Sequence, residues 1–523
     1  MKKKSSIVIL AFVLMLSLAL AGCSSKSNST KKNEKQSTLV FGRSGDSVSL
    51  DPAIVTDGES FSVTKNIFET LLEFGEQDTE VKEGLATEWS NTDDGLTYTL
   101  KLREGVKFSD GTDFNAEAVV YNFKRWSAGD KEQFYYYNSQ FGDVIKEVKA
   151  SDEHTVVFTL KRPLAPFYKN LAMSPFAIAS PAALEKYGDK FGENPVGTGP
   201  FVFKEWKKND RITVEKNKNY WDSALPKLDS VIFRAIPDNS ARLNALNSGE
   251  VDLITDVNFN DVKTIESNKD LQVFYRPSLN VGYLGLTATR GPLKEKLVRQ
   301  ALNYAVDKNA LIDAFYAGAA DPAKNPMPPV VAGYNDEVED YEYNPEKAKE
   351  LLKEAGYEDG FSMELWAMPV PRPYMPDGQK VAEAIQKNFA DIGVKAKIVS
   401  YEWGTYLEKA RLGEADSFLL GWTGDNGDAD NFLYVLLDKD SIGSNNYSYY
   451  ENSKVHDLLV EAQSTADQAK REELYKQAQV IIKDDAPWIP LVHSKPALAG
   501  KANLKGFLPH PTGSDVLSTV EFE

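Results

Sequence analysis

The sequence predicts an α/β fold, because stretches with helical spacing of apolar residues alternate with short strand-like stretches. Gly378 to Asp391 has the spacing of an amphipathic helix, and Val394 to Val399 behind it has the pattern of a strand. The apolar run Ser417 to Leu420 breaks abruptly into glycines and carboxylates. Ligand sites of α/β proteins lie at strand ends, so this break is a candidate site.

The overall composition limits the class of protein. With 523 residues the chain is long enough for two or three domains, and its formal net charge is −17. Such an acidic surface argues against binding to nucleic acid and against electrostatic binding of a polybasic segment to anionic lipid. The single cysteine excludes an internal disulfide, so the fold depends on its hydrophobic cores.

The first 22 residues have the pattern of a secretory signal peptide. Lys2, Lys3 and Lys4 precede an apolar run, which ends in Leu20-Ala21-Gly22-Cys23. This tetrapeptide resembles the bacterial lipobox, which implies cleavage before Cys23 and lipid on its thiol. Residues 23–37 have few apolar side chains after Cys23 and are predicted to be a flexible tether. We expect a protein anchored by lipid outside the cytoplasm, at a Gram-positive cell surface.

In chain order, the first half predicts one strand, one long helix and then a strand-rich region. Ser37 to Phe41 is the first predicted strand, and Ser60 to Phe74 has helical apolar spacing. Leu96 to Leu102 and Thr155 to Leu160 alternate as half-buried strands do. Asn115 is a suitable N-cap for the helix that follows it.

The second half predicts a helix-rich α/β unit. Lys347 to Ala355 is helical, with Asn344-Pro345 in front, and Gln468 to Lys483 forms a long helix that ends before Pro487. We find neither an internal repeat nor coiled-coil heptads.

Three motifs, in this order, resemble the family 5 extracellular solute-binding proteins of ABC importers. They are Leu85 to Arg125 (with Trp89, Asp94-Gly95, Tyr98, Arg103, Gly105-Val106 and Asp110-Gly111), Asn194 to Phe201, and Val298 to Asp307. The resemblance extends from about Leu39 to the C-terminus. It implies a type II, cluster C periplasmic-binding-protein fold, with two α/β lobes joined by a hinge and an extra subdomain in the first lobe. Lobe I would comprise residues 38–278, lobe II residues 279–493, and residues 494–523 would return to lobe I.

Three further segments resemble the dipeptide-binding subgroup of that family. They are Leu365 to Tyr374, Ser400 to Gly404 and Gly421 to Phe432. The resemblance implies that Arg372 binds the peptide carboxylate and that Asp425 binds its amine.

The same pair follows from the chemistry of a free peptide. A cleft that encloses an ammonium and a carboxylate must pair both groups. Arg372, between Pro371 and Pro373, can hold a carboxylate through two parallel hydrogen bonds. Asp425 offers a carboxylate in a partly dry loop. The alternatives are a surface ion pair for Arg372 and a solvated acidic turn for Asp425.

Other candidate ligand-binding residues surround this pair. Trp422 and Tyr374 would form walls, and Gly424 would offer backbone hydrogen bonds. Thr56 and Gly58 match a ligand-facing loop of the first lobe, although a simple surface turn explains them equally well.

The sequence gives no support for an enzyme, a cofactor or a metal centre. The four histidines (His154, His456, His493 and His510) lack the spacing of metal ligands, and Asp428-Ala429-Asp430 lacks the rest of a calcium loop. Hydrolase and phosphate-binding motifs are also missing from the sequence.

These observations predict a monomeric substrate-binding lipoprotein that captures dipeptides or other short peptides and delivers them to the transmembrane subunits of an ABC permease. The alternatives are another solute in the same fold (an oligopeptide, glutathione, haem or a nickel complex) or a receptor for peptide signals.

Overall fold

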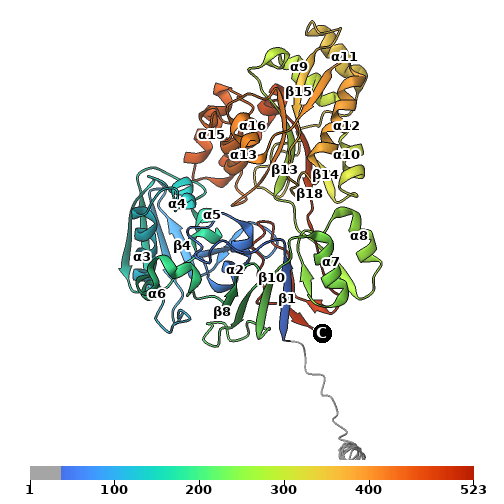
Figure 1. Cartoon of the computed structure of the whole chain (residues 1–523). Helices are drawn as coiled ribbons and strands as arrows, with labels where there is room; N and C mark the ends of the chain where they lie inside the picture. The colour runs from blue at the N-terminus through green and yellow to red at the C-terminus, as the bar shows by residue number, and fades with distance from the viewer. Residues whose placement is uncertain (1–36) are drawn as a thin grey trace, which may run out of the picture. The chain divides into compact units, whose positions relative to one another are not determined.

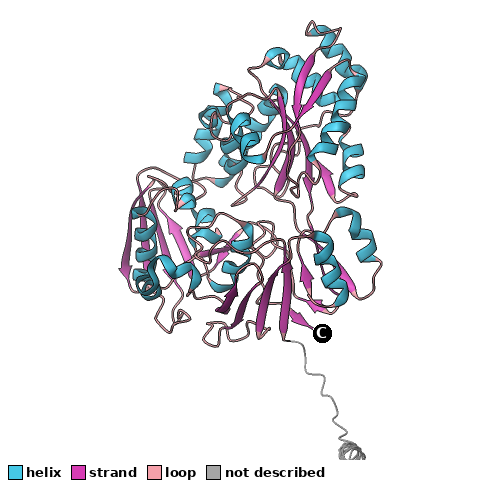
Figure 2. Ribbon diagram, viewed as in Figure 1, coloured by secondary structure: helices cyan, strands magenta, loops and turns pink. Residues whose placement is uncertain are grey.

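The computed structural model of the protein describes residues 37–523. The predicted signal peptide, Cys23 and all but the last residue of the tether lie outside the described residues. Within the described residues, no helix is both long enough and apolar enough to span a membrane. Figure 1 follows the elements in chain order, and Figure 2 shows sheets with helices packed beside them.

Lobe I is built on a seven-stranded mixed sheet. Its strands are β1 (Thr38–Arg43), β8 (Phe201–Lys207), β9 (Arg211–Lys216), β10 (Ser230–Ala235), β11 (Leu253–Ile254), β12 (Leu271–Tyr275) and β19 (Ala497–Lys501). They lie in the order β12-β19-β11-β1-β10-β9-β8. The central strand β1 contains the fully buried Leu39 and Phe41, which matches the predicted first strand. Helices α2 (Gly58–Ile67), α7 (Asn239–Ser248) and α8 (Phe259–Glu266) belong to this lobe.

Lobe I also contains a separate four-stranded antiparallel sheet. Its strands are β4 (Ala86–Asn91), β5 (Thr97–Leu102), β6 (Ile145–Asp152) and β7 (Thr155–Leu160), in the order β4-β5-β7-β6. Helix α3 (Ala116–Ala128) packs on β6 and β7, and Asn115 caps it by accepting a 3.1 Å hydrogen bond from the Ala118 N–H. Helices α4 (Tyr135–Gln140), α5 (Phe167–Leu171) and α6 (Pro181–Tyr187) complete this region, which Figure 1 shows in blue and cyan.

Lobe II is built on a six-stranded sheet. Its strands are β13 (Asn280–Leu286), β14 (Ala320–Pro322), β15 (Ser362–Trp366), β16 (Lys395–Val399), β17 (Ser417–Thr423) and β18 (Trp488–Ser494), in the order β14-β18-β13-β17-β15-β16. Its helices are α9 (Lys296–Ala305), α10 (Lys308–Phe315), α11 (Pro345–Glu354), α12 (Gly378–Asp391), α13 (Trp403–Arg411), α14 (Asp430–Leu437), α15 (Ser453–Ser464) and α16 (Gln468–Asp485). Figure 1 shows α10 and α12 on one side of the sheet and α13, α15 and α16 on the other.

The chain crosses between the lobes twice. It leaves the first sheet at the end of β12 and enters the second at β13, and it returns between β18 and β19. The two crossing segments run side by side, since the Arg276 N–H donates a 2.9 Å hydrogen bond to the Pro496 carbonyl. Smaller two-stranded sheets pair β2 (Leu72–Phe74) with β3 (Val81–Glu83), and β20 (Leu504–Lys505) with β21 (Glu521–Phe522).

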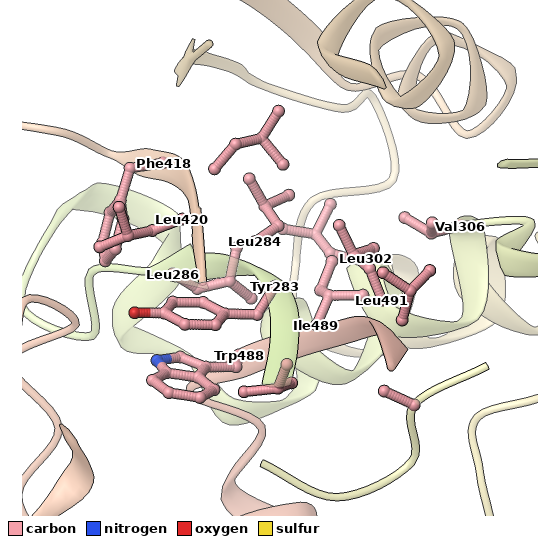
Figure 3. Packing of buried hydrophobic residues seen from close by; sticks show 14 of the residues in the cluster. Tyr283, Leu284, Leu286, Leu302, Val306, Phe418, Leu420, Trp488, Ile489 and Leu491 are labelled. Atoms are coloured by element: carbon pink, nitrogen blue, oxygen red, sulfur yellow. The ribbon is translucent and has the colours of Figure 1, made fainter. Parts of the chain in front are cut away.

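The core of lobe II forms around strand β13, all of whose residues are buried. Figure 3 shows Tyr283 lying flat against Trp488, with ring centroids 3.5 Å apart and an interplanar angle of 4°. Aliphatic residues such as Leu302, Val306 and Leu491 belong to the same buried cluster and lie to one side of this stack. A stacked aromatic pair in a dense core fixes the strands rigidly. Tyr283 therefore holds the neighbouring surface of lobe II in a fixed position.

Two predicted boundaries are wrong. The helix predicted over Ser60 to Phe74 ends at Ile67, because Thr70 donates two hydrogen bonds to Glu73 from its backbone N–H and its hydroxyl, at 3.1 and 2.8 Å. This local turn competes with the helix, and the apolar residues beyond it form β2. The strand predicted to end at Leu420 continues to Thr423, since β13 pairs with it along its whole length.

Candidate ligand-binding site

A cavity of about 600 Å³ lies between the two lobes, within the range typical of small-ligand sites. Lobe I contributes side chains that include Phe61, Phe74 and Tyr136, and lobe II contributes others that include Tyr283 and Trp403. All seven ligand-binding residues predicted from the sequence line this cavity: Thr56, Gly58, Arg372, Tyr374, Trp422, Gly424 and Asp425.

Strand order brings the lobe II residues together. Strands β17, β15 and β16 are neighbours, and β15 pairs in parallel with both of the others. The carboxyl ends of parallel strands meet at one edge of a sheet, so the segments that follow these three strands converge. Asp425 follows β17, Arg372 follows β15, and Trp403 follows β16. Segments far apart in the sequence therefore face one cavity.

The Asp425 carboxylate is partly buried and has no ion-pair partner among the described residues. It accepts hydrogen bonds from the Tyr136 hydroxyl at 3.3 Å and from the Asn431 side-chain amide at 3.2 Å. Burial raises the pKa of the Asp425 carboxyl, and these two hydrogen bonds only partly oppose the rise. A buried carboxylate without a cation is unfavourable unless a ligand supplies the positive charge.

Asn431 was not predicted from the sequence, but it holds two predicted residues in place. Its side-chain oxygen accepts hydrogen bonds from the Trp422 indole N–H at 3.0 Å and from the Asp425 backbone N–H at 3.1 Å. Its amide nitrogen donates to the Asp425 carboxylate. One amide therefore fixes both the wall and the anion of the cavity.

Arg372 lies in a tight turn, in which its N–H and carbonyl exchange hydrogen bonds with Met375 at 3.0 and 2.9 Å. Its side chain is exposed, and the guanidinium carbon is 5.8 Å from the centre of the Trp403 ring. No ion pair involves Arg372 within residues 37–523, so the surface ion pair that we considered as an alternative is not formed. The guanidinium donates a long, 3.4 Å hydrogen bond to the Pro371 carbonyl and also contacts the Tyr374 side chain, and its other N–H groups can still pair with a carboxylate.

Two glycines have a packing role that the sequence did not indicate. Gly282 and Gly421 are cross-strand partners in β13 and β17. A Cβ atom on Gly421 would lie 2.2 Å from the Tyr374 ring, and one on Gly282 would lie 2.5 Å from the Tyr374 carbonyl oxygen. The glycines therefore seat Tyr374, a cavity wall, against the sheet.

The remaining predicted residues offer fewer polar groups than expected. The Gly424 N–H donates to the Leu279 carbonyl at 2.8 Å, and the Gly424 carbonyl has no hydrogen-bond partner within residues 37–523. The Trp422 N–H is bound to Asn431, so Trp422 presents an apolar face. Thr56 and Gly58 lie at the start of α2, which Asp57 caps by accepting from the Ser60 N–H at 2.8 Å.

The tip of the loop behind Asp425 is held by both lobes. The Asp428 carboxylate accepts two hydrogen bonds from Arg471, at 2.6 and 2.7 Å, and both side chains are buried. Although burial opposes its charge, Arg471 and then Lys169 hold the pKa of Asp428 at about 2. From lobe I, Lys169 donates to the Gly427 carbonyl at 2.6 Å. Asp428 is thus neutralised by arginine, which argues against the calcium-like pattern noted in the sequence.

Elsewhere, one group of side chains has the composition of a metal site. The ligand atoms of Asp438, Asp440 and His456 lie within 4.8 Å of one another. The Asp438 carboxylate is already occupied, because it contacts the His456 ring nitrogen at 3.1 Å and accepts from the Asp440 N–H at 2.8 Å. These contacts give the group a structural role.

Comparison with known proteins agrees with this architecture. Residues 80–444 match the model of the bacterial extracellular solute-binding proteins, family 5. The chain belongs to this family. The match covers more than half of the chain and confirms the family and the two-lobe α/β fold expected from the sequence motifs.

Individual relatives extend over nearly the whole chain. The dipeptide-binding protein of Escherichia coli K12 is 41% identical over 93% of this chain and 95% of its own length. The heme-binding protein A of Haemophilus influenzae is 37% identical over the full length of both chains. Among solved structures, the periplasmic binding protein DppA of Helicobacter pylori in complex with the peptide STSA has a TM-score of 0.78 and 36% identity, and covers 94% of this chain and 98% of its own.

Proposed function

We propose that this family 5 solute-binding protein serves a peptide ABC importer and captures dipeptides or other short peptides between its lobes. The observation that carries the proposal is the presence of two opposite charges without ion-pair partners, Asp425 and Arg372, in one cavity. A free peptide supplies the complementary ammonium and carboxylate, and each must be paired when water is excluded. The names of the dipeptide-binding relatives support the same substrate class.

Each cavity residue then has a distinct role. Asp425 binds the peptide amine, and Arg372 binds the peptide carboxylate through parallel hydrogen bonds. Trp422 and Tyr374 enclose the backbone as apolar walls. The Gly424 carbonyl, Thr56 and Gly58 contact the peptide from the two lobes. Tyr136, on lobe I, completes the amine site when the lobes are closed.

The proposal includes a hinge and an anchor. Residues 38–278 and 494–523 would move as one body and residues 279–493 as the other, with closure around the ligand. Residues 1–22 would be removed as a signal peptide. Lipid on Cys23 and the tether 23–37 would then hold a monomer outside the cytoplasm, on a Gram-positive cell surface, within reach of the permease.

The requirement to pair both Asp425 and Arg372 also favours peptides over the alternative solutes. Haem carries carboxylates but no ammonium, so it would leave Asp425 unpaired. A nickel complex does not need both an anion and a cation. An extended peptide lengthens by at most ~3.3–3.6 Å per residue, so only peptides whose length matches the separation of the two anchors can pair both termini.

The role of Arg372 as the carboxylate anchor is tested by comparing the native protein with Arg372→Ala, each with a free-acid dipeptide and with its C-terminally amidated form. In Arg372→Ala, we expect a free-acid dipeptide to bind about tenfold more weakly, because a charge-assisted bidentate contact is lost. The C-terminally amidated dipeptide should lose much less, since it carries no carboxylate. Calorimetric Kd values of both peptides for the native protein and the variant give the comparison.

Arg162→Ala, which removes an exposed arginine outside the cavity, is the control and should alter neither Kd. Equal losses for the acid and the amide in Arg372→Ala would mean that Arg372 supports the turn rather than the ligand.

A further inference from the structure

A second cavity, of about 230 Å³, lies in lobe I directly beside the ligand cavity. The two cavities share four lining residues: Phe74, Ser174, Thr512 and Ser514. Independent small-ligand sites usually measure about 300–1,000 Å³, so this volume suits part of a ligand better than a whole one. We call this second cavity the side chamber.

The side chamber has acidic walls. Glu69, Glu73, Glu76 and Glu83 line it, against a single lysine, Lys65. Lys65 is paired with Glu73, and Arg103 lies 3.5 Å from Glu83. His510 also lines the chamber, but burial lowers its pKa to about 4, so it is neutral at pH 7. The chamber therefore carries net negative charge.

Among the described residues, Glu69 and the exposed Glu76 are the two lining carboxylates without an ion-pair partner, and Glu69 is the more buried of them. One of its oxygens accepts hydrogen bonds from the Tyr220 hydroxyl at 2.8 Å and from the Trp221 indole N–H at 2.9 Å. No ion pair involves Glu69 among residues 37–523, and burial raises its pKa to about 7. These are the same conditions that mark Asp425 as an anchor in the main cavity.

Apolar side chains also line the side chamber that holds this carboxylate. Phe74 stacks on His510 with ring centroids 5.9 Å apart, where the two cavities meet. Trp221, Leu508 and Val516 line the chamber and keep 37%, 40% and 39% of their surface exposed. A long side chain with an aliphatic stem and a charged end fits such a lining. Trp221 already holds a cation on its ring, since the Arg103 guanidinium lies 4.1 Å from its centroid.

We propose that the side chamber takes the side chain of a lysine or arginine in the bound peptide, with Glu69 as the anionic partner of that side chain. This inference rests on the proposed peptide-binding function and adds a substrate preference to it. An acidic side chain would add repulsion to the chamber, and an apolar one would leave Glu69 without a cation.

The test uses the purified full-length chain, freed of co-purified ligand by unfolding and refolding, and measures Kd by calorimetry. The ligands are Ala-Ala, Ala-Lys, Lys-Ala, Ala-Glu and Glu-Ala, with norleucine peptides as neutral near-isosteres of the lysine peptides. In at least one of the two positions, lysine should bind about tenfold tighter than norleucine, and glutamate should bind weakest.

Glu69→Gln removes the charge but keeps the oxygen that accepts from Tyr220 and Trp221. In this variant the preference for lysine over norleucine should fall to within about twofold. Glu104→Gln, which removes an exposed carboxylate outside the chamber, should leave the preference intact.

Equal binding of lysine and norleucine at both positions in the native protein would overturn the inference, and so would a preference that survives Glu69→Gln. If Ala-Ala and all the other dipeptides fail to bind, the proposed function itself fails. Loss of all dipeptide binding can therefore be distinguished from loss of the lysine preference alone, which overturns only the inference about the side chamber.

Discussion

Replacing Asp425 with asparagine is expected to weaken binding of a free dipeptide at least ~100-fold, because one partner of a buried charge pair is lost at a cost of about 3 kcal/mol or more. The effect should be large because Tyr136 and Asn431 stabilise the carboxylate but supply no positive charge. Calorimetric titration of native and variant proteins measures it.

The same variant should not lower the stability of the free protein. Burial raises the pKa of Asp425, so its charge is unfavourable in the empty cavity. Asparagine removes that charge and keeps the size of the side chain. The melting temperature should therefore stay equal or rise. Asp93→Asn, at an exposed site, controls for the change in net charge.

The peptide provides a second control. An N-acetylated dipeptide has no ammonium group, so it should bind the native protein and Asp425→Asn equally weakly. An affinity of Asp425→Asn for the free dipeptide within threefold of the native value would contradict the role of Asp425 as the amine anchor.

Replacing Gly427 with alanine is expected to hinder closure of the lobes and to weaken peptide binding at least ~10-fold. Gly427 lies at the tip of the loop behind Asp425, and an added Cβ would be 2.0 Å from the Thr79 hydroxyl of lobe I. Such overpacking costs about 1–3 kcal/mol, and only the closed arrangement needs to bear it. Small-angle scattering with and without ligand should show reduced compaction on binding, beside the higher Kd.

Two further variants separate contact from backbone strain. Gly427 has φ of 61°, so alanine there is strained as well as crowded. Gly443 has φ of 79° but nothing within 4 Å of an added Cβ. Gly443→Ala therefore carries a similar strain without the interlobe contact and should bind normally. Thr79→Gly should restore binding to Gly427→Ala, and failure to do so would place the defect within the loop.

The predictable part of the fold was the part with strong local signals. Helix α12 has the predicted bounds of Gly378 and Asp391, and Asn115 caps α3 as expected. The end of α2 was missed because a local turn at Thr70 competes with the helix, and the end of β17 was missed because another segment decides it. Strand β17 runs past Leu420 because β13 pairs with it as far as Thr423, and no local pattern indicated that partner.

The cavity residues divide in the same way, into those that the sequence indicated and those that a distant segment determines. A free peptide needs an anion and a cation, and the motif resemblance indicated which residues to choose, so the presence of Asp425 and Arg372 in this cavity was predictable. Tyr136 was not, because its contact with Asp425 spans 289 positions in the sequence. The role of Gly421 was also missed, since it is set by the Tyr374 ring that packs on it.

The measurement that tests the central claim most directly is a calorimetric length series of di-, tri- and tetraalanine, on protein refolded to remove co-purified peptide. If Asp425 and Arg372 bind the two ends of one peptide, dialanine should bind tightly and affinity should fall with each added residue. The length that matches the anchors is the one that pairs both charges. Preference for tetraalanine over dialanine would contradict the two-anchor cavity, and absence of binding by all three peptides would contradict the peptide-binding function.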